Sequence, residues 1–201
     1  INTDGPMLVI AGAGSGKTKV LTTRIAYLIK EKNVAPWNII AITFTNRAAN
    51  EMKERLEKII GTQDSNATWV STFHSSCVRI LRRDIDKIGY TKSFTIYDDN
   101  DKKKLVRSMM KKCNIDEKQV KPRSVMNYIS DCKNRFCNPD EAKLEASSFV
   151  ENKKADVFLE YEKELKNNNA LDFDDLLVKT VDLFRDAPDV LHKYQKQFEY
   201  I

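Results

Sequence analysis

A glycine-rich run that ends in a lysine and a threonine lies near the start of the chain, where residues 11–18 read A-G-A-G-S-G-K-T. Glycines let the backbone curl so that successive N–H groups point inward, and a helix starting near Lys17 adds the positive end of its dipole. The Lys17 ammonium would neutralise the β and γ phosphates of a nucleotide, and the Thr18 hydroxyl would hold Mg²⁺. Ala11 replaces the first glycine of the strict phosphate-loop pattern, but later glycines make the turn. The residues predicted to bind the phosphates are Ala11, Gly12, Ala13, Gly14, Ser15, Gly16, Lys17 and Thr18.

Two groups of polar side chains, each with one aromatic ring, follow short apolar runs. The groups are Thr43, Phe44, Thr45 and Asn46, and Ser71, Thr72, Phe73 and His74. Hydroxyls and helix N-termini suit the phosphates of a DNA strand, and an aromatic face suits an unstacked base. In the structural alternative, Thr45 or Asn46 caps a helix while Phe44 and Phe73 fill the core. From the residues alone, both interpretations stay open.

The elements that must position these groups follow a strand-then-helix rhythm. Strands are predicted at Met7–Ala11, Ile39–Phe44 and Thr68–Thr72, and helices at Lys17–Lys30, Asn46–Ile60 and Ser75–Ile88. Such alternation is typical of a parallel α/β sheet, in which ligands collect at the carboxyl ends of the strands. Gly61 and Gly89 follow two of the helices and are predicted to end them, because a C-terminal cap favours a residue that tolerates positive φ.

The pattern changes from about Tyr90 onward and becomes helical and highly charged, after one short β-like run at Ser93–Tyr97. No further strand is predicted until Phe198–Ile201, which resembles the opening of another strand. The helices predicted in this part are Asn100–Cys113, Pro122–Arg135, Pro139–Ala146, Phe149–Asn167, Asp172–Phe184 and Pro188–Phe198.

Four segments occur in the order found in one helicase family: A-G-A-G-S-G-K-T, A-I-T-F-T-N-R-A-A-N-E-M-K-E-R, S-T-F-H-S-S-C-V-R-I-L-R-R-D-I and L-D-F-D-D-L-L. With them, essentially all 201 residues resemble superfamily 1 DNA helicases of the UvrD/Rep/PcrA family. The resemblance implies an α/β fold: a RecA-like P-loop NTPase parallel sheet with an inserted all-helical accessory domain. Residues 1–90 would be part of the first motor domain and residues 91–190 the accessory domain. Residues 191–201 would return to the motor domain, ahead of a complete Walker B strand.

The same resemblance implies an ATP- and Mg²⁺-dependent enzyme that moves 3′ to 5′ along single-stranded DNA and unwinds duplex DNA in repair or replication. Lys17 and Thr18 would be its catalytic contribution here, with Thr18 holding Mg²⁺ through ATP. The family's contacts with DNA fall on residues 43–46 and 71–74, with Phe44 as the base-stacking residue. The family's D-E-x-Q motif is absent from the 201 residues, so the chain is expected to bind nucleotide without turnover. Lys19 stands where relatives often have Arg, and an ammonium lacks the planar stacking of a guanidinium.

Composition is consistent with a polyanionic partner, because the formal net charge is +5. Expected partners are single-stranded and duplex DNA together with repair or transcription proteins, and a monomer is expected. No apolar stretch is long enough to span a membrane and no secretory signal is recognised, which with reduced thiols predicts a cytoplasmic protein. Other P-loop enzymes are less consistent with the sequence, since no N-K-x-D guanine motif and no acceptor-site arginine lid is found. The helical part could instead be a protein-interaction module.

Two further patterns in the helical part have a functional and a structural interpretation. Asp172, Asp174 and Asp175 could bind a metal, but acids at the start of a helix more often cap N–H groups. The basic runs could hold duplex phosphates or form a solvated face. These basic residues are Arg79, Arg82, Arg83, Lys102, Lys103, Lys104, Lys111, Lys112, Lys121, Arg123, Lys133 and Arg135. Trp37 and Trp69 are both predicted to be packing residues.

Overall fold

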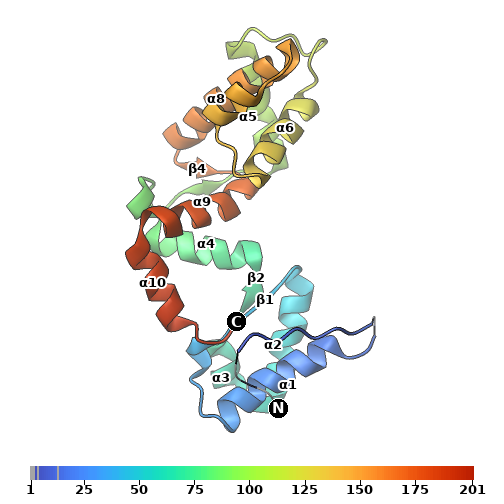
Figure 1. The fold of residues 1–201 in the computed structure, drawn as a ribbon, viewed down its shortest axis with the longest axis vertical. Coiled ribbons are helices and arrows are strands. Elements are labelled where there is room, and N and C mark those ends of the chain that lie inside the picture. Colours follow the sequence, from blue (N-terminus) through green and yellow to red (C-terminus); the bar gives the residue numbers. More distant parts are fainter. Residues whose placement is uncertain (1–2, 4, 13) are drawn as a thin grey trace. The chain divides into compact units, whose positions relative to one another are not determined.

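The computed structural model describes residue 3, residues 5–12 and residues 14–201. The chain folds into two units, of which the first is formed by Ile1–Ser76 with Leu191–Ile201 and the second by Cys77–Val190 (Figure 1). The chain passes from one unit to the other within α4 (Phe73–Asp84) and returns within α10 (Pro188–Gln197).

The first unit contains a small parallel sheet. Strand β1 (Ile40–Thr43) pairs with β2 (Trp69–Thr72) in the register Ile40↔Trp69 to Thr43↔Thr72. Tyr200 forms a parallel bridge to Ile39 on the other side of β1, which agrees with the strand opening predicted near the end of the sequence. Around the sheet lie α1 (Lys17–Lys30), η1 (Pro36–Asn38), α2 (Asn46–Ile60) and α3 (Thr62–Ala67).

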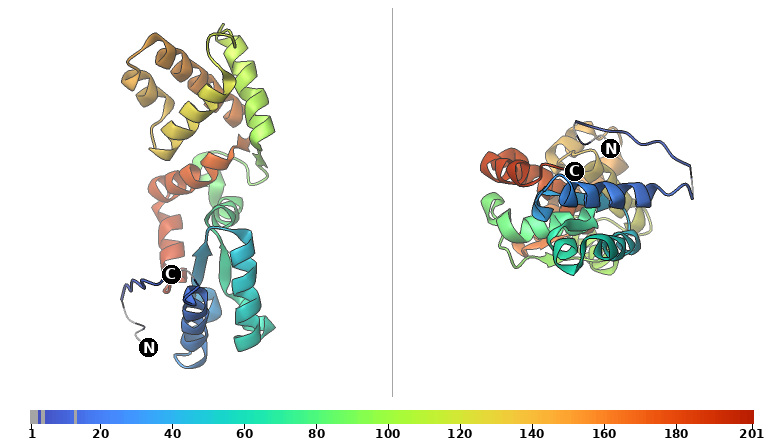
Figure 2. Two further views of the ribbon diagram at one scale, coloured as in Figure 1. Left: turned by 90° about the vertical axis from the view of Figure 1, so that its right-hand side faces the viewer. Right: turned by 90° about the horizontal axis from the view of Figure 1, so that it is seen from below.

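Helices α1 and α2 lie beside the strands because each has one apolar face (Figure 2). Ala49, Met52 and Leu56 recur at helical spacing on α2 and pack with Ile25 and Leu28 of α1. The Thr45 side chain caps α2 by accepting from Ala48 N at 3.1 Å. Gly61 ends the helix at φ +86°, a conformation that favours glycine, as predicted. The predicted bounds of α2 are confirmed.

The second unit is a helical bundle with a second parallel sheet, which has two strands of two residues each. Strand β3 (Thr95–Ile96) pairs with β4 (Ala170–Leu171), and η2 (Ile85–Ile88) ends at Gly89, which has a positive φ as predicted. The helices are α5 (Asp99–Lys112), α6 (Pro122–Asn134), α7 (Pro139–Glu145), α8 (Phe149–Asn167) and α9 (Phe173–Asp186). Their core includes Val125, Ile129, Phe158, Tyr161 and Leu165.

Local sequence signals account for the ends of these helices. Asp98 and Ser148 accept hydrogen bonds from first-turn N–H groups of α5 and α8, and Asn138 forms a capping box at α7. Pro122 and Pro139 stand at the first helical position, where a missing N–H is harmless. All six helices predicted from residue 100 onward are present, with ends that differ by at most two residues.

Two predictions about elements and one about a packing residue are wrong. No strand forms at Met7–Ala11: Leu8 and Ile10 are 86% and 90% exposed. A parallel strand needs a neighbouring strand to pair with its N–H and C=O groups. Beside β1, on the side away from β2, this pairing is made by Tyr200 and not by residues 7–11. Strand β4 was not predicted, because two residues are too few for a periodic signal. Trp37 is 59% exposed rather than packed in the core, whereas Trp69 is buried as predicted.

Among the residues that the structure describes, none of the helices has the length and the apolar composition that a membrane crossing requires.

Candidate functional site

The predicted phosphate loop leads directly into α1. Gly14 and Gly16 have φ values of +74° and +89°, so the backbone curls through conformations that other residues rarely adopt. The Ser15 hydroxyl donates to the Gly12 carbonyl at 2.7 Å and closes the turn. Ala13, also predicted to line the loop, lies outside the described residues. The curled backbone ends at Gly16, which caps the N-terminus of α1.

Lys17 turns back over this loop. Its ammonium donates to the carbonyls of Ala11 at 3.1 Å and Gly12 at 2.7 Å. Neutral carbonyls are weaker acceptors for an ammonium than phosphate oxygens, because a phosphate oxygen carries a negative charge that adds an ionic attraction to the hydrogen bond. Thr18, which is half-buried, follows in the first turn of α1. The loop therefore presents a lysine whose carbonyl partners an anion can replace.

A cavity of about 480 Å³ opens beside the loop. Its wall is mostly apolar, with the hydroxyls of Ser15 and Thr23 and two cations, Lys19 and Arg24, and none of the described residues that line it is a carboxylate. Within this wall, Arg24 Nη1 lies 3.6 Å from the sulfur of Met7. The residues that line the cavity are Met7, Val9, Ser15, Gly16, Lys19, Val20, Thr23 and Arg24. Such a wall suits a flat, weakly polar group attached to a negative one.

The carboxyl ends of β1 and β2 bring the two predicted aromatic residues together. Thr43 pairs with Thr72, so Phe44 and Phe73 leave the sheet at the same edge. Their ring centroids are 5.6 Å apart at an interplanar angle of 43°. Phe44 is 88% exposed and Phe73 is 44% exposed. The core-filling alternative is therefore wrong for both rings, which form an exposed aromatic pair that sequence spacing alone did not reveal.

Three polar residues around this pair, Thr45, Thr72 and Ser71, already have structural partners. Thr45 caps α2, and the Thr72 hydroxyl accepts from Ser75 N at 3.2 Å and donates to Ser75 Oγ at 2.9 Å. Asn46 is the first residue of α2, and His74 lies in the first turn of α4. Ser71 is hydrogen-bonded to Ser76 at 2.6 Å. The structure thus brings both predicted groups to one sheet edge, where helix N-termini and rings lie together.

The acidic triad of the second unit caps α9, as the structural interpretation predicted. Asp172 Oδ1 accepts from Asp175 N at 2.9 Å, and Asp175 Oδ2 accepts from Asp172 N at 3.0 Å. Asp174 instead pairs with Lys102 at 2.7 Å. The other oxygens meet Lys133, whose ammonium lies 2.7 Å from Asp175, 3.1 Å from Asp172 and 2.7 Å from Glu162.

Two lysines of the predicted basic runs are therefore wrong as candidates for phosphate contact. Lys102 and Lys133 are buried, because helices α5 and α6 turn them inward toward α9. Burial alone would lower the pKa of Lys133, but the surrounding carboxylates outweigh burial and raise that pKa well above its usual value. Helical periodicity does not distinguish an inward lysine from a solvated one, so only the packed structure shows these partners.

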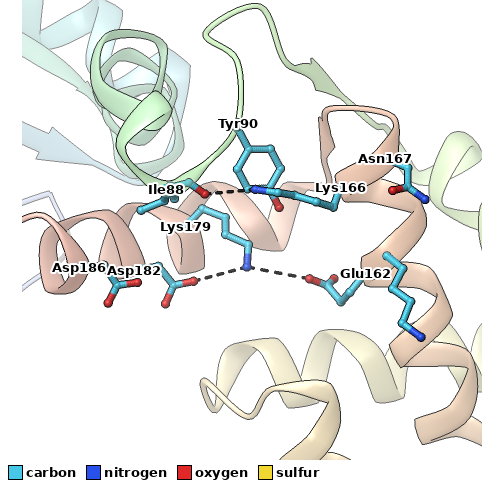
Figure 3. Close-up of a pocket in the computed structure, with 9 residues that line it drawn as sticks. Ile88, Tyr90, Glu162, Lys166, Asn167, Lys179, Asp182 and Asp186 are labelled. Atoms are coloured by element: carbon cyan, nitrogen blue, oxygen red, sulfur yellow. Dashed lines mark hydrogen bonds and ion pairs between the residues drawn. The ribbon is translucent and has the colours of Figure 1, made fainter.

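A polar cavity of about 470 Å³ in the second unit was not predicted from sequence. Lys179 lies between Glu162 at 4.0 Å and Asp182 at 3.4 Å (Figure 3). The Lys166 ammonium lies 3.4 Å from the centre of the Tyr90 ring and donates to the Ile88 carbonyl at 3.1 Å. The lining of this cavity contains three lysines and three carboxylates. The charges balance, so this cavity has little attraction for a polyanion.

Comparison with known proteins identifies relatives over nearly the whole chain. Residues 1–201 match the profile of the UvrD/REP helicase N-terminal domain. The chain is 52% identical over 199 residues to the ATP-dependent DNA helicase PcrA of Bacillus subtilis (strain 168). It is 51% identical over 199 residues to the proteins of that name from Staphylococcus aureus (strain Mu50) and Staphylococcus epidermidis (strain RP62A). Each alignment covers 99% of this chain but 27% of the relative.

Proposed function

Since the chain belongs to the UvrD/REP helicase family, we propose that it forms the nucleotide-binding and DNA-contacting part of an ATP-dependent DNA helicase. The parent enzyme would move 3′ to 5′ along single-stranded DNA and unwind duplex DNA in repair or replication. The exposed Phe44–Phe73 pair is the observation that supports DNA contact most directly, because it lies at the edge where α2 and α4 begin.

ATP with Mg²⁺ is the proposed cofactor, and the chemistry of the loop fits it. The Lys17 ammonium would exchange the neutral carbonyls of Ala11 and Gly12 for stronger bonds to the negatively charged oxygens of the β and γ phosphates. The Thr18 hydroxyl is a hard oxygen ligand of the kind Mg²⁺ prefers. Bound Mg²⁺–ATP supplies the phosphoanhydride bond whose cleavage drives movement. The backbone N–H groups of residues 11–16, with the N-terminus of α1, would hold its phosphates.

Single-stranded DNA is the proposed ligand of the sheet edge. A base stacked on an aromatic ring contributes about 1–3 kcal/mol, and Phe44 offers nearly its whole face to solvent. The N-termini of α2 and α4 point their dipoles at the same edge, which favours phosphate oxygens. The site residues on this edge are Thr43, Phe44, Thr45, Asn46, Ser71, Thr72, Phe73 and His74.

In domain terms, we propose that residues 1–90 and 191–201 contribute to a RecA-like motor domain and that residues 91–190 form an accessory domain. The parallel pairing of β1, β2 and Tyr200 supports the first assignment. The separate helical core of the second unit supports the other.

DNA binding is tested with the 201-residue chain and a fluorescent single-stranded oligonucleotide. Phe44→Ala removes the exposed ring and should weaken binding by about 1–3 kcal/mol, which is roughly 5- to 150-fold in Kd. Phe149→Ala is the matched control, because Phe149 is also exposed, at 74%, but lies in the second unit. Equal losses in both variants, or none in Phe44→Ala, would contradict the assignment of the edge.

Nucleotide binding is tested with a fluorescent ATP analogue. Lys17→Met should abolish measurable binding, whereas Lys30→Met, at the far end of the same helix, should leave it intact. The family's D-E-x-Q motif is absent from residues 1–76 and 191–201, which form the first unit, so the 201-residue chain should bind ATP without releasing phosphate. Phosphate release by the purified chain that is lost in Lys17→Met would contradict this part of the proposal.

A further inference from the structure

A buried hydrogen-bonded chain runs beneath the edge that bears the aromatic pair. The indole N–H of Trp69 donates to Ser76 Oγ at 3.1 Å, and Ser76 Oγ lies 2.6 Å from Ser71 Oγ. Trp69 and Ser76 are buried, whereas Ser71 is only half-buried. Two residues of β2 and one of α4 therefore share a single polar path from the interior to the edge.

The direction of each proton in this path follows from the donors available. An indole N–H can only donate, so Ser76 Oγ must accept from Trp69. Two arrangements of the Ser71–Ser76 bond are then possible. In the first, Ser76 donates its proton to Ser71. In the second, Ser71 donates to Ser76, and the Ser76 proton has no acceptor among the residues that the structure describes. An unsatisfied O–H at a buried position is disfavoured by roughly tenfold or more. Ser76 is therefore the donor, and Ser71 the acceptor, in the 2.6 Å bond.

Because Ser71 accepts in its bond with Ser76, the proton of the Ser71 hydroxyl remains available for a second hydrogen bond. Within the described part of the chain, Ser71 has Ser76 as its one hydrogen-bond partner, and its side chain is still partly open to solvent. A hydroxyl that already accepts a bond is polarised to donate more strongly. Phosphodiester oxygens accept hydrogen bonds and never donate them, so they match this group.

The Trp69 ring packs against Phe198, which belongs to the C-terminal segment of the same unit. The Phe198 ring meets it edge-on, with centroids 5.1 Å apart and planes at 87°, and Phe198 itself stacks on Tyr194 with centroids 6.2 Å apart. Trp69 and Ser71 also lie on the same face of β2, since side chains alternate along a strand. The indole N–H is thus aimed at Ser76 by packing rather than by chance rotation.

We propose that Ser76 and Trp69 are positioning residues that keep the Ser71 hydroxyl as a donor to one phosphodiester of single-stranded DNA. This inference rests on the proposed function, because it needs DNA at the sheet edge. It assigns Ser76 and Trp69 a part in binding although neither reaches the ligand.

The test measures the Kd of the 201-residue chain for single-stranded oligonucleotides by fluorescence anisotropy. Ser71→Ala should weaken binding about tenfold, as expected for a lost hydrogen bond to a charged group. Trp69→Phe keeps the ring but removes the N–H, and should weaken binding about threefold because the Ser76–Ser71 bond is then free to reverse. Trp69→Phe combined with Ser71→Ala should bind like Ser71→Ala alone. Trp37→Phe, at an exposed position, is the control and should not change Kd.

An oligonucleotide series with single methylphosphonates supplies a readout that a purely structural role would not move. At one phosphate position the effects of Ser71→Ala and Trp69→Phe should both disappear. The dependence of Kd on salt should be unchanged in these variants, because a neutral hydroxyl releases no counterions. Additive losses in the double variant, or variant effects that persist at every methylphosphonate position, would overturn the inference while the proposed function stands. A wild-type chain that binds no DNA would overturn both.

Discussion

Lys133 is the central cation of the second unit, and its replacement tests whether the charge network around it supports the fold. The side chain is 3% exposed and lies within 3.1 Å of Glu162, Asp172 and Asp175. Lys133→Met keeps a long unbranched side chain but removes the ammonium. The carboxylates would then remain buried without their shared counter-ion.

The expected loss follows from the partners that remain. Removing one member of a buried ion pair costs about 3–5 kcal/mol, because the other charge stays desolvated. Lys102 still lies 3.2 Å from Asp172, so the lower end of that range applies. For a unit of this size, each kcal/mol corresponds to roughly 4 °C in melting temperature. We therefore expect Lys133→Met to lower the Tm of the second unit by about 12 °C.

Thermal unfolding followed by far-ultraviolet circular dichroism measures this loss. Lys103→Met, one residue along from Lys102 but exposed on α5, is the matched control and should melt like the wild type. The loss in Lys133→Met should shrink at acidic pH, since protonation removes the unpaired negative charges. A melting temperature equal to that of the control, or a loss that is the same at every pH, would refute the reasoning.

Three further variants test other parts of the fold. Burial raises the pKa of Asp175 to about 7; Asp172 and Glu162 add to this shift and Lys133 opposes it. Between about pH 4 and pH 7 the folded chain therefore keeps a proton on Asp175 that the unfolded chain has lost. As the pH rises through this range, the contribution of Asp175 to the free energy of unfolding decreases. Asp175→Asn should flatten that slope in a series of melting curves, and an unchanged slope would count against the assignment. Gly61→Ala should lower the free energy of unfolding, measured in urea, by about 1–3 kcal/mol, because φ +86° with ψ 165° strains any residue other than glycine. An added Cβ would meet no atom within 4 Å, so backbone strain is the only expected cause. An unchanged free energy of unfolding would exclude this strain. Asp98→Ala removes two hydrogen bonds that cap α5 and should lower the free energy of unfolding by about 1 kcal/mol in the same measurement. A change near zero would mean that water replaces the Asp98 carboxylate as the acceptor for these N–H groups.

Much of the helical part could be predicted because helix ends depend on neighbouring residues. The bounds of α2 and α8 agree with prediction since Thr45 and Ser148 cap them locally and Gly61 ends the first. The capping role of Asp172 follows from the same local rule. The glycine-rich loop was also readable, because its residue types act through their own backbone and the helix that follows.

The sequence by itself determined the helices, their caps and the composition of the phosphate loop, because each depends on residues a few positions apart. Only the tertiary structure decided that Phe44 and Phe73 form one exposed pair, that Lys133 faces inward, and that Met7–Ala11 does not join the sheet. These outcomes depend on which distant segment packs against which. A strand requires a partner for its backbone, and a buried charge requires a counter-ion, wherever in the chain that partner lies.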